Sequence, residues 1–402
     1  MRVSIKPGIA QGQVSAPPSK SMAHRLLICA GMSRGKSVIH GMSHCEDALA
    51  TMDCLRALGA ECTLDGDTVT VVGCDVCHTK PLGELCCRES GSTLRFFLPL
   101  ALLSGNTTTM YGSAYLMQRP MGVYEELCRI HGLEYQQKGQ RIQVKGPLSA
   151  GEYTVAGNIS SQFISGLLFA LPLCNGESKI KMIPPIESRS YINMTLSALH
   201  EFGIRADWID DCTLNIHGNQ QYRSCETTVE GDWSNAAFLD ALGCLGGDVT
   251  VTGLCADTLQ GDRVYREYFK QLCSGIPTLH IGDCPDLGPI LFALAAAKNG
   301  ATFTGTARLK IKESDRAAVM AQELKKMGAD LAVDEDRVIV SATALHEPIE
   351  PLNGHNDHRI VMSLAVLLTL VGGEIYDAQA VEKSFPDFFD RITALGLEVQ
   401  KQ

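Results

Sequence analysis

One module of helices and strands recurs six times along the chain, with a period of roughly 70 residues. Each copy begins with a polar or glycine-bearing loop and continues through an almost wholly apolar helix and a short strand. It closes with a more amphipathic helix, a glycine and a hairpin. In the first copy these parts fall at 25–30, 37–41, 48–58, 59–60 and 62–72. A unit of this length is too long for a solenoid repeat and is typical of a compact α/β unit.

The apolar helices define the repeat most clearly. They are expected at 22–32, 94–103, 163–173, 236–245, 289–297 and 359–371. Helices that are apolar on all sides must be buried, so we expect the sheets outside them and the amphipathic helices between. Any α/β protein alternates helix and strand, but the recurring order and period favour a true repeat. Six copies predict two similar α/β domains of three copies each.

The domain boundaries follow from the hairpins and from the N-terminus. The hairpin that ends near Gly218 closes the first three copies, which predicts a main boundary near Arg223. The opening strand at 3–5 precedes the first copy and can pair with the second domain, which requires another crossing near Ser15. The expected N-terminal three-repeat domain is therefore 15–223. The second three-repeat domain is expected to combine 1–14 with 224–402.

Charge and apolar content exclude several classes of protein. The 402 residues carry a formal net charge of -10, which argues against nucleic acid or an anionic membrane as the main partner. The N-terminus lacks the apolar core of a signal peptide, and the longest apolar stretch, 360–371, is too short to span a bilayer. The sixteen cysteines are scattered through apolar segments, as expected of reduced thiols in a cytosolic protein. These features predict a cytoplasmic protein.

Two positive charges lie at the start of the first apolar helix. The prolines at 17–18 end the preceding strand, and Ser19 and Ser21 are typical N-cap residues. Lys20 is therefore expected at a helix N-terminus, with Arg25 about one turn further in. A helix N-terminus offers free N–H groups and a positive dipole end, so the stretch predicts a phosphate or carboxylate site. Taken alone, it is equally compatible with a surface lysine near a capped helix.

The loops before the other apolar helices are also polar or charged. They occur at 88–95, 157–162, 230–235, 284–289 and 354–359. If the copies are equivalent, all six helix N-termini face one cleft between the domains. Each helix end contributes about 0.3–1 kcal/mol towards an anion, whereas a hydrogen bond from Arg or Lys contributes about 1.5–3 kcal/mol. The charged side chains therefore determine the affinity for an anion, and the helix ends determine where the anion binds.

Several short motifs occur in a fixed order along the chain. They are Pro-Ser-Lys-Ser-x-x-x-Arg at 18–25, Gly-Ser-Thr-Leu-Arg at 91–95, Arg119-Pro120, Ser160-Ser161-Gln162, Ser188-x-x-Tyr191, Pro285-Asp286, Lys312-Glu313-Ser314-Asp315-Arg316, Asn356-Asp357-His358-Arg359 and Lys383-Ser384-Phe385-Pro386-Asp387. In this order and spacing, over essentially the whole chain, they resemble the EPSP synthase family of enolpyruvyl transferases. The resemblance implies two similar domains, each of three βαβαββ repeats around buried parallel helices. This is an inside-out α/β barrel with the active site in the cleft between the domains.

The resemblance also implies an activity. Enzymes of this family transfer the enolpyruvyl group of phosphoenolpyruvate to the 5-hydroxyl of shikimate 3-phosphate, by addition and elimination, and release phosphate. The reaction belongs to the shikimate pathway of aromatic amino acid biosynthesis. No metal or organic cofactor is implied. The expected partners are these two small molecules, with no nucleic acid and no membrane, and the protein is expected to be a monomer.

The matching motifs imply which residues of this chain correspond to the functional residues of the family. The residues expected to bind phosphoenolpyruvate are Lys20, Gly91, Arg119, Gln162, Arg316, Arg359 and Lys383. Those expected to bind shikimate 3-phosphate are Ser21, Arg25, Ser160, Ser161, Gln162, Ser188, Tyr191, Asp286 and Lys312. Asp286 is expected to take the proton of the attacking hydroxyl, and Glu313 and Lys20 to serve the other proton transfers.

Two alternatives remain open. The first is the related enzyme that transfers enolpyruvyl to UDP-N-acetylglucosamine, which carries Lys-Asn near its start and a cysteine shortly before an Arg-Pro pair. This chain has Lys20-Ser21, and 115–120 contains no cysteine. The second is a catalytically inactive binding member of the family, against which the intact set of lysine, arginine, aspartate and glutamate residues argues.

Overall fold

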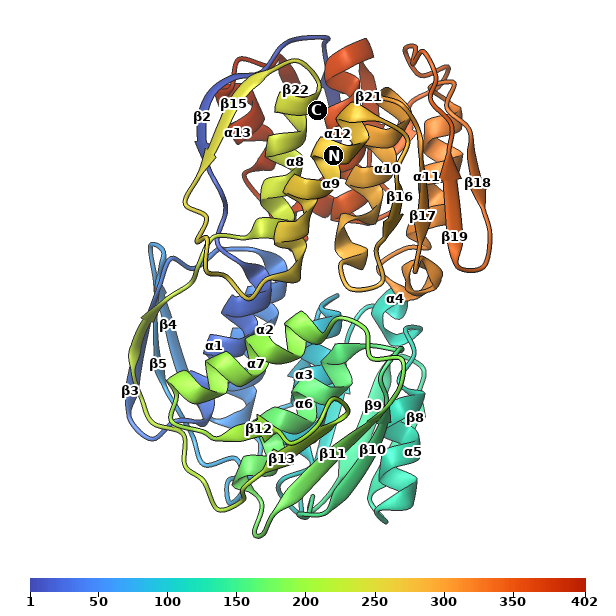
Figure 1. Ribbon diagram of the computed structural model, residues 1–402. Helices are drawn as coiled ribbons and strands as arrows, with labels where there is room; N and C mark the ends of the chain where they lie inside the picture. The colour runs from blue at the N-terminus through green and yellow to red at the C-terminus, as the bar shows by residue number, and fades with distance from the viewer. The chain divides into compact units, whose positions relative to one another are not determined.

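The chain divides into two compact units in the computed structural model, which describes all residues, 1–402 (Figure 1). One unit is Lys20–Glu230. The other combines Met1–Ser19 with Gly231–Gln402. The strands of the two units form six small sheets, none of which draws strands from both units.

The unit Lys20–Glu230 contains three four-stranded sheets of one design. Their strand orders are β14(Glu226–Thr228)-β3(Lys36–His40)-β5(Thr68–Val72)-β4(Glu61–Asp65), β6(Leu85–Cys86)-β7(Thr107–Tyr111)-β9(Arg141–Lys145)-β8(Glu134–Lys138) and β10(Glu152–Ala156)-β11(Ser178–Ile183)-β13(Thr213–Ile216)-β12(Ala206–Trp208). In each sheet the first two strands are parallel and the other pairings are antiparallel. The repeat predicted from the sequence is therefore confirmed as a repeated sheet topology.

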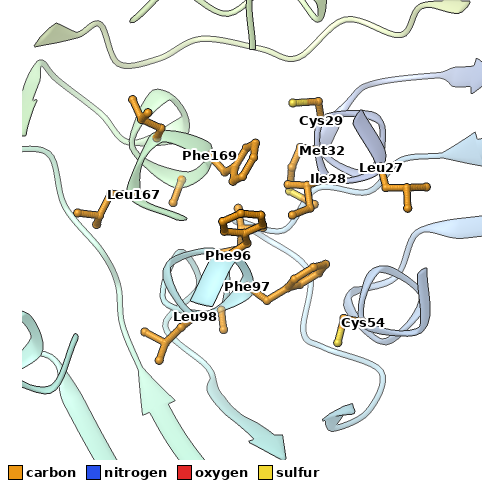
Figure 2. Packing of buried hydrophobic residues seen from close by; sticks show 14 of the residues in the cluster. Leu27, Ile28, Cys29, Met32, Cys54, Phe96, Phe97, Leu98, Leu167 and Phe169 are labelled. Carbon is orange, nitrogen blue, oxygen red and sulfur yellow. The ribbon is translucent and has the colours of Figure 1, made fainter. Parts of the chain in front are cut away.

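Three apolar helices form the core of this unit. They are α1(Lys20–Met32), α3(Gly91–Ala101) and α6(Ser161–Ala170), each buried along most of its length. Figure 2 shows Phe96 of α3 against Phe169 of α6, with ring centroids 5.4 Å apart, and Ile28 of α1 in the same cluster. Burying each such side chain stabilises the fold by about 1.5–3 kcal/mol. Pro172 has no N–H to continue the helix, so 171–173 forms a 3₁₀ turn where the sequence predicted helix.

The remaining helices of this unit close each copy. They are α2(Glu46–Leu58), α5(Gly122–Ile130) and α7(Arg189–Glu201), together with the short α4(Ala114–Met117). The end of α2 shows why a glycine closes the copy. Gly59 adopts φ +109°, which turns the chain so that its N–H donates to the carbonyl of Arg56, and the N–H of Ala60 donates to the carbonyl of Leu55. A residue with a Cβ would be strained in this conformation.

The second unit repeats this plan with one shortened copy. Its sheets are β16(Thr278–His280)-β17(Ala301–Thr304)-β19(Arg337–Val340)-β18(Leu331–Val333), β20(Leu352–Asn353)-β21(Gly373–Tyr376)-β1(Arg2–Ile5)-β22(Val399–Lys401) and the two-stranded β15(Asp248–Thr252)-β2(Gln11–Ser15). The opening strand β1 pairs antiparallel with β21 and β22. The fourth copy has no hairpin, and Gly275 at its closing position is extended rather than left-handed.

Three apolar helices again form the core of the second unit. They are α8(Trp233–Cys244), α10(Gly288–Ala297) and α12(His358–Val371), which contact one another. The helices α9(Tyr265–Ser274), α11(Arg316–Lys325) and α13(Phe388–Ala394) bury fewer of their side chains. Because a wholly apolar helix is stable only when its whole circumference is covered, the sequence pattern alone distinguishes the two sets.

An exchange of edge strands accompanies the two passages of the chain between the units. The strand β2 precedes α1 in sequence but pairs in parallel with β15 of the second unit. The strand β14 precedes α8 but pairs in parallel with β3 of the first unit. At each passage the strand therefore stays in the unit that the chain leaves, and the helix that follows belongs to the other unit.

Candidate active site

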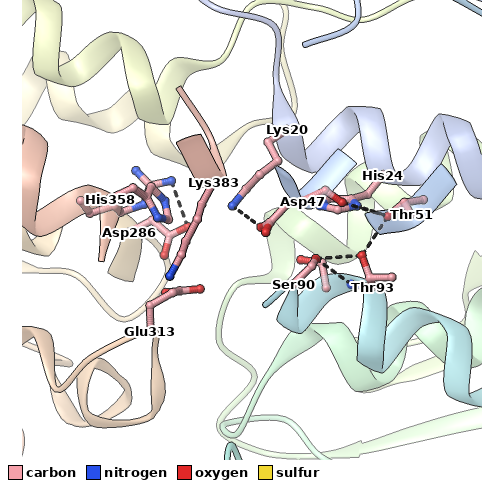
Figure 3. Close-up of polar contacts among 12 residues, drawn as sticks. Lys20, His24, Asp47, Thr51, Ser90, Thr93, Asp286, Glu313, His358 and Lys383 are labelled. Carbon is pink, nitrogen blue, oxygen red and sulfur yellow. Dashed lines mark hydrogen bonds and ion pairs between the residues drawn. The ribbon is translucent and has the colours of Figure 1, made fainter. Parts of the chain in front are cut away.

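Lys20 begins α1 and forms an ion pair in the unit Lys20–Glu230. Its Nζ donates to Oδ2 of Asp47, 2.8 Å away in the first turn of α2, as Figure 3 shows. The Lys20 and Asp47 side chains are 13% and 10% exposed, so the pair is largely shielded from water. The carboxylate therefore fixes the ammonium group at the positive end of a helix. Lys20 belongs to a motif that the sequence reveals, whereas no local motif marks Asp47.

A chain of buried hydrogen bonds runs from α1 to the start of α3. The Nδ1 of His24 lies 2.6 Å from Oγ1 of Thr51, which lies 2.9 Å from Oγ1 of Thr93 (Figure 3). Thr93 donates to Oγ of Ser90, and Ser90 also accepts the Thr93 N–H as the N-cap of α3. Burial lowers the pKa of His24 well below its ordinary value, and the nearby charges of Lys20 and Arg25 lower it further. This neutral network fixes the relative positions of α1, α2 and α3.

Arg25 lies buried between α1 and α7. Its Nε donates to Oγ1 of Thr195, its Nη1 to the carbonyl of Ser21 and its Nη2 to the carbonyl of Tyr191, at 2.6–2.9 Å. Two of its five N–H groups remain for an anion. Burial lowers the pKa of Arg25 to about 10, which leaves it charged at neutral pH. Ser188 precedes α7 in a left-handed conformation and is buried, and the structure thus brings the predicted residues Ser21, Arg25, Ser188 and Tyr191 to one region.

The starts of α3 and α6 are joined by side-chain hydrogen bonds. Arg95 donates through Nη1 to Oε1 of Gln162 at 2.7 Å, and Gln162 donates through Nε2 to Oγ of Ser92 at 2.9 Å. Ser160 caps α6 by accepting the Gln162 N–H, and Ser161 is the first residue of that helix. The predicted residues Ser160, Ser161 and Gln162 therefore lie beside the start of α3. Arg95 is part of the recognised motif, but its role in orienting Gln162 was not foreseen.

Gly91 supports the guanidinium of Arg119. A Cβ placed on Gly91 would lie only 2.9 Å from Cζ of Arg119 and would overlap its Nη1. No conformational strain is involved, because Gly91 is the first residue of α3 and has an ordinary helical backbone. The absence of a side chain therefore allows the close approach of Arg119. This gives a physical reason for glycine at a position predicted to bind phosphoenolpyruvate.

Replacing Gly91 with alanine should displace Arg119, which is predicted to bind phosphoenolpyruvate, and should weaken that binding. We expect KM for phosphoenolpyruvate to rise about tenfold, the effect of losing roughly 1.4 kcal/mol of binding energy. Steady-state kinetics with varied phosphoenolpyruvate measures this. Gly122→Ala is the matched control, because Gly122 also begins a helix and has open space around its Cβ position. Equal KM values for the two variants would contradict the placement of Arg119.

In the second unit, Arg316 is the centre of a buried ion cluster. It begins α11 and is only 1% exposed. Its Nε donates to Asp357, its Nη1 to Asp286 and its Nη2 to Glu313, at 2.7–2.8 Å. Burial opposes the charge, but Asp357, Glu313 and Asp286 together raise the pKa of Arg316 above its ordinary value. Three predicted site residues, Arg316, Asp286 and Glu313, thus meet in one cluster.

Asp357 is the part of this cluster that sequence analysis did not assign. It is fully buried, caps α12 by accepting the Arg359 N–H at 2.9 Å, and accepts a hydrogen bond from Ser314 at 3.0 Å. One carboxylate therefore serves the helix end, Ser314 and the Arg316 ion pair. Its position in the Asn-Asp-His-Arg motif next to an arginine was the only available signal.

Asp286 contacts three cations. Its Oδ1 lies 2.8 Å from Arg316 and 3.1 Å from Lys312, and its Oδ2 lies 3.3 Å from Arg359. Burial alone would raise its pKa, but Lys312, Arg359 and Arg316 hold the pKa of Asp286 well below the ordinary value. Asp286 lies in a 3₁₀ turn, Pro285–Leu287, directly before α10, which begins at Gly288. Pro285 begins this turn, where its missing N–H is not needed.

Arg359 retains unsatisfied hydrogen-bonding capacity. It is 4% exposed, and its Nε and Nη1 are buried without a hydrogen-bond partner. Buried donors are almost always satisfied, so a buried guanidinium with two free nitrogens indicates a position for an anion. The Nζ of Lys383 donates to the carbonyl of Asn356 at 2.6 Å, just before the start of α12. No group of three or more His, Cys, Asp or Glu side chains in the structure could hold a metal ion.

Each unit thus gathers its predicted residues around the starts of helices and the loops before them. The unit Lys20–Glu230 contains Lys20, Ser21, Arg25, Gly91, Arg119, Ser160, Ser161, Gln162, Ser188 and Tyr191. The other unit contains Asp286, Lys312, Glu313, Arg316, Arg359 and Lys383. Repeated α/β units with cationic side chains at helix starts define a class of protein that binds small anions.

Comparisons with known proteins identify the particular family. The model of the family described as EPSP synthase (3-phosphoshikimate 1-carboxyvinyltransferase) matches residues 6–277 and 268–392. A 3-phosphoshikimate 1-carboxyvinyltransferase of Clostridium kluyveri is 37% identical over 99% of this chain and 98% of its own length. One of Clostridium botulinum is 36% identical over 98% of this chain and 96% of its own length. The chain belongs to the EPSP synthase family.

The solved structures agree with this assignment. An EPSP synthase from Acinetobacter baumannii superimposes with a TM-score of 0.79 and 25% identity, covering 100% of both chains. The family resemblance and the α/β fold class predicted from the sequence are therefore confirmed. No helix in the structure has the length and apolar character needed to cross a membrane.

Proposed function

We propose that this protein transfers the enolpyruvyl group of phosphoenolpyruvate to the 5-hydroxyl of shikimate 3-phosphate and releases phosphate. Its relatives of nearly equal length are named for this carboxyvinyl transfer. The observation that carries the proposal is Arg359, a buried guanidinium with two unsatisfied nitrogens beside the Asp286 carboxylate. Such an arrangement suits an anionic substrate placed next to a proton acceptor.

The direct test is release of inorganic phosphate by the purified protein. Phosphate should appear only when both substrates are present, together with a stoichiometric amount of 5-enolpyruvylshikimate 3-phosphate detected by mass spectrometry. UDP-N-acetylglucosamine in place of shikimate 3-phosphate should give none. Absence of phosphate release at millimolar substrate would favour the inactive binding member instead. Release with the UDP-sugar would favour the related transferase.

The residues predicted to contact substrate belong to both units. We propose that Lys20, Gly91, Arg119, Gln162, Arg316, Arg359 and Lys383 bind phosphoenolpyruvate, and that Ser21, Arg25, Ser160, Ser161, Gln162, Ser188, Tyr191, Asp286 and Lys312 bind shikimate 3-phosphate. Both substrates are multiply charged anions, which require several cationic side chains. The remaining N–H groups of Arg25 and Arg359 support this division.

The proposed chemistry moves protons at two places, the attacking hydroxyl oxygen and the methylene carbon of phosphoenolpyruvate. The 5-hydroxyl oxygen attacks C2 of phosphoenolpyruvate, Asp286 takes the hydroxyl proton, and the methylene carbon gains a proton from Lys20 or Glu313. Elimination then breaks the C–O bond to phosphate and returns a methyl proton to the protein. Three cations keep Asp286 ionised but weakly basic. A substrate anion that engages Arg359 or Lys312 would draw positive charge away and strengthen the base.

The cellular location, oligomeric state and partners of the protein are part of this proposal. We propose a cytoplasmic monomer that acts on small molecules, without nucleic-acid or membrane partners. The formal net charge of -10 supports the exclusion of nucleic acid, since a polyanion would be repelled by most of the surface.

Lys312 should make the reaction sensitive to alkaline pH. Burial lowers the pKa of Lys312 to about 8, although Asp286 partly opposes this. The side chain is a cation below that pH and neutral above it, so it binds a phosphate group only at lower pH. We therefore expect kcat/KM for shikimate 3-phosphate to fall about tenfold per pH unit above pH 8, since kcat/KM reports the free enzyme.

A variant with a permanent charge provides the control for this pH dependence. Arginine stays protonated across the whole range, so Lys312→Arg should remove the fall near pH 8 even where its absolute activity is lower. Kinetics from pH 7 to 9.5 measure both profiles, and the substrate phosphate is fully ionised over most of that range. An unchanged inflection in Lys312→Arg would show that another group titrates.

A further inference from the structure

Three arginines in the unit Lys20–Glu230 differ from all the others in the chain. The side chains of Arg34, Arg205 and Arg223 form no hydrogen bond, ion pair or ring contact. Each of the other sixteen of the nineteen arginines has at least one such partner. In a chain with an excess of acidic residues, arginines normally find carboxylates. Three that do not, in one unit, therefore need an explanation.

The three arginines meet at one surface depression. A cavity of about 590 Å³ is lined by Arg34 and Arg223, and an adjoining cavity of about 270 Å³ is lined by His200, Arg205 and Arg223. The two cavities share Gln220 as well as Arg223, and neither lining includes an aspartate or glutamate. Like charges that line one exposed depression repel one another, and a bound anion would relieve this repulsion.

The segment 220–223 holds the backbone of the three arginines in place. The side chain of Gln220 accepts the Arg205 N–H at 2.7 Å and donates to the Arg205 carbonyl at 2.8 Å. The Arg34 N–H donates to the carbonyl of Tyr222, and Arg223 follows directly in the chain. Tyr222 is itself buried. All three arginines therefore project from a common hydrogen-bonded frame, and ligand binding would order only their side chains.

The depression is distinct from the candidate active site. The helices α1 and α7 carry predicted site residues at their starts, Lys20 and Tyr191 among them. Arg34 follows the end of α1, and His200 lies in the last turn of α7. Each helix has 13 residues and therefore spans about 20 Å. The unpartnered arginines thus lie at the opposite ends of both helices.

We propose that this depression binds a small anion with two or more phosphate or carboxylate groups. Arg223 lines both cavities, with Arg34 beside it in one and Arg205 in the other. Each guanidinium offers a planar pair of donors, which matches the oxygens of such an anion. A single phosphate would occupy one or two of them and leave like charges facing each other. The site is separate from the proposed transfer reaction and does not depend on it.

Inorganic pyrophosphate is the probe for this site. Calorimetric titration of the whole protein compares wild type with the triple variant Arg34→Gln, Arg205→Gln, Arg223→Gln. The matched control is Arg129→Gln, Arg141→Gln, Arg337→Gln, which removes three exposed arginines that form surface ion pairs. Wild type and both variants keep the candidate active site, so any pyrophosphate that binds there contributes equally in all three proteins. At constant ionic strength near 0.1 M, the first variant should bind at least tenfold more weakly than wild type and the control.

Other outcomes separate this proposal from its alternatives. Citrate in place of pyrophosphate tests whether carboxylates suffice, and binding of either probe that requires the three arginines supports the site. Without added anion, kcat/KM of the triple variant should equal that of wild type. Equal pyrophosphate affinity in all three proteins overturns the proposal. Binding of an RNA oligonucleotide, but of neither small anion, in an arginine-dependent manner overturns it in favour of a macromolecular partner.

Discussion

Replacing Arg316 with methionine should destabilise the unit that contains it by about 3–5 kcal/mol, the usual cost of removing one member of a buried ion cluster. The substitution leaves Asp286, Glu313 and Asp357 facing an apolar side chain, and Asp357 is fully buried. Three carboxylates without their shared partner repel one another, and each loses the hydrogen bond that the Arg316 guanidinium donates. Activity should be lost as well, because Arg316 orients the proposed base.

Urea denaturation followed by circular dichroism measures this loss. The control is Arg337→Met, which removes an exposed arginine that pairs with Asp334 and should cost less than about 1 kcal/mol. Combining Arg316→Met with Asp357→Asn should recover part of the stability, because the amide keeps the α12 cap without the buried charge. Additive losses in the double variant would contradict the cluster.

The destabilisation by Arg316→Met should depend on pH in a definite direction. Without the guanidinium, burial and mutual repulsion raise the carboxyl pKa values in the folded state above those in the unfolded state. Groups of that kind stabilise the folded state at low pH and lose this contribution as pH rises. The difference from wild type should therefore be smaller at pH 5 than at pH 8. A difference independent of pH would indicate lost packing rather than lost charge pairing.

The repeat and its helices could be predicted because they depend on local sequence. The apolar helices α10 and α12 follow directly from composition, since a segment without a polar face must be buried. The closing glycine at 59 could also be predicted locally, because a left-handed turn at a helix end favours glycine. The exchange of β2 and β14 was not predicted in this form. Strand pairing over such sequence distances leaves no periodic signal.

Site residues could be predicted where they belong to a recognised motif. Their ion-pair partners elsewhere in the chain could not. Lys20, Arg316 and Arg359 belong to recognised motifs, whereas Asp47 pairs with Lys20 from 27 residues away with no motif of its own. Arg25 was expected simply as an anion ligand, but its buried contacts also join α1 to α7. Substituting it would therefore confound stability with binding. The predicted domain ranges, the predicted cleft between the domains and the assigned residue roles stay predictions.

Replacing Lys20 with methionine should lower kcat/KM by at least about 10³-fold. A charge-assisted hydrogen bond to a substrate anion contributes about 1.5–3 kcal/mol, and a proton transfer adds about 10²–10⁴-fold. Methionine has nearly the same length and keeps the apolar part of the side chain. The unpaired Asp47 would also lower stability, since its side chain is only 10% exposed and would lose its charge partner.

The companion variants separate catalysis from the ion pair. Asp47→Asn leaves the Lys20 charge in place and should cost at most about tenfold, because the carboxylate only positions the ammonium group. In the double variant Lys20→Met, Asp47→Asn the unpaired carboxylate is gone, so the melting temperature should return to the wild-type value while kcat/KM stays low. Recovery of activity in the double variant would show that Lys20 serves only to neutralise Asp47. Its position at the start of α1 would then have no catalytic meaning, and the proton transfers would fall to Glu313 and Asp286.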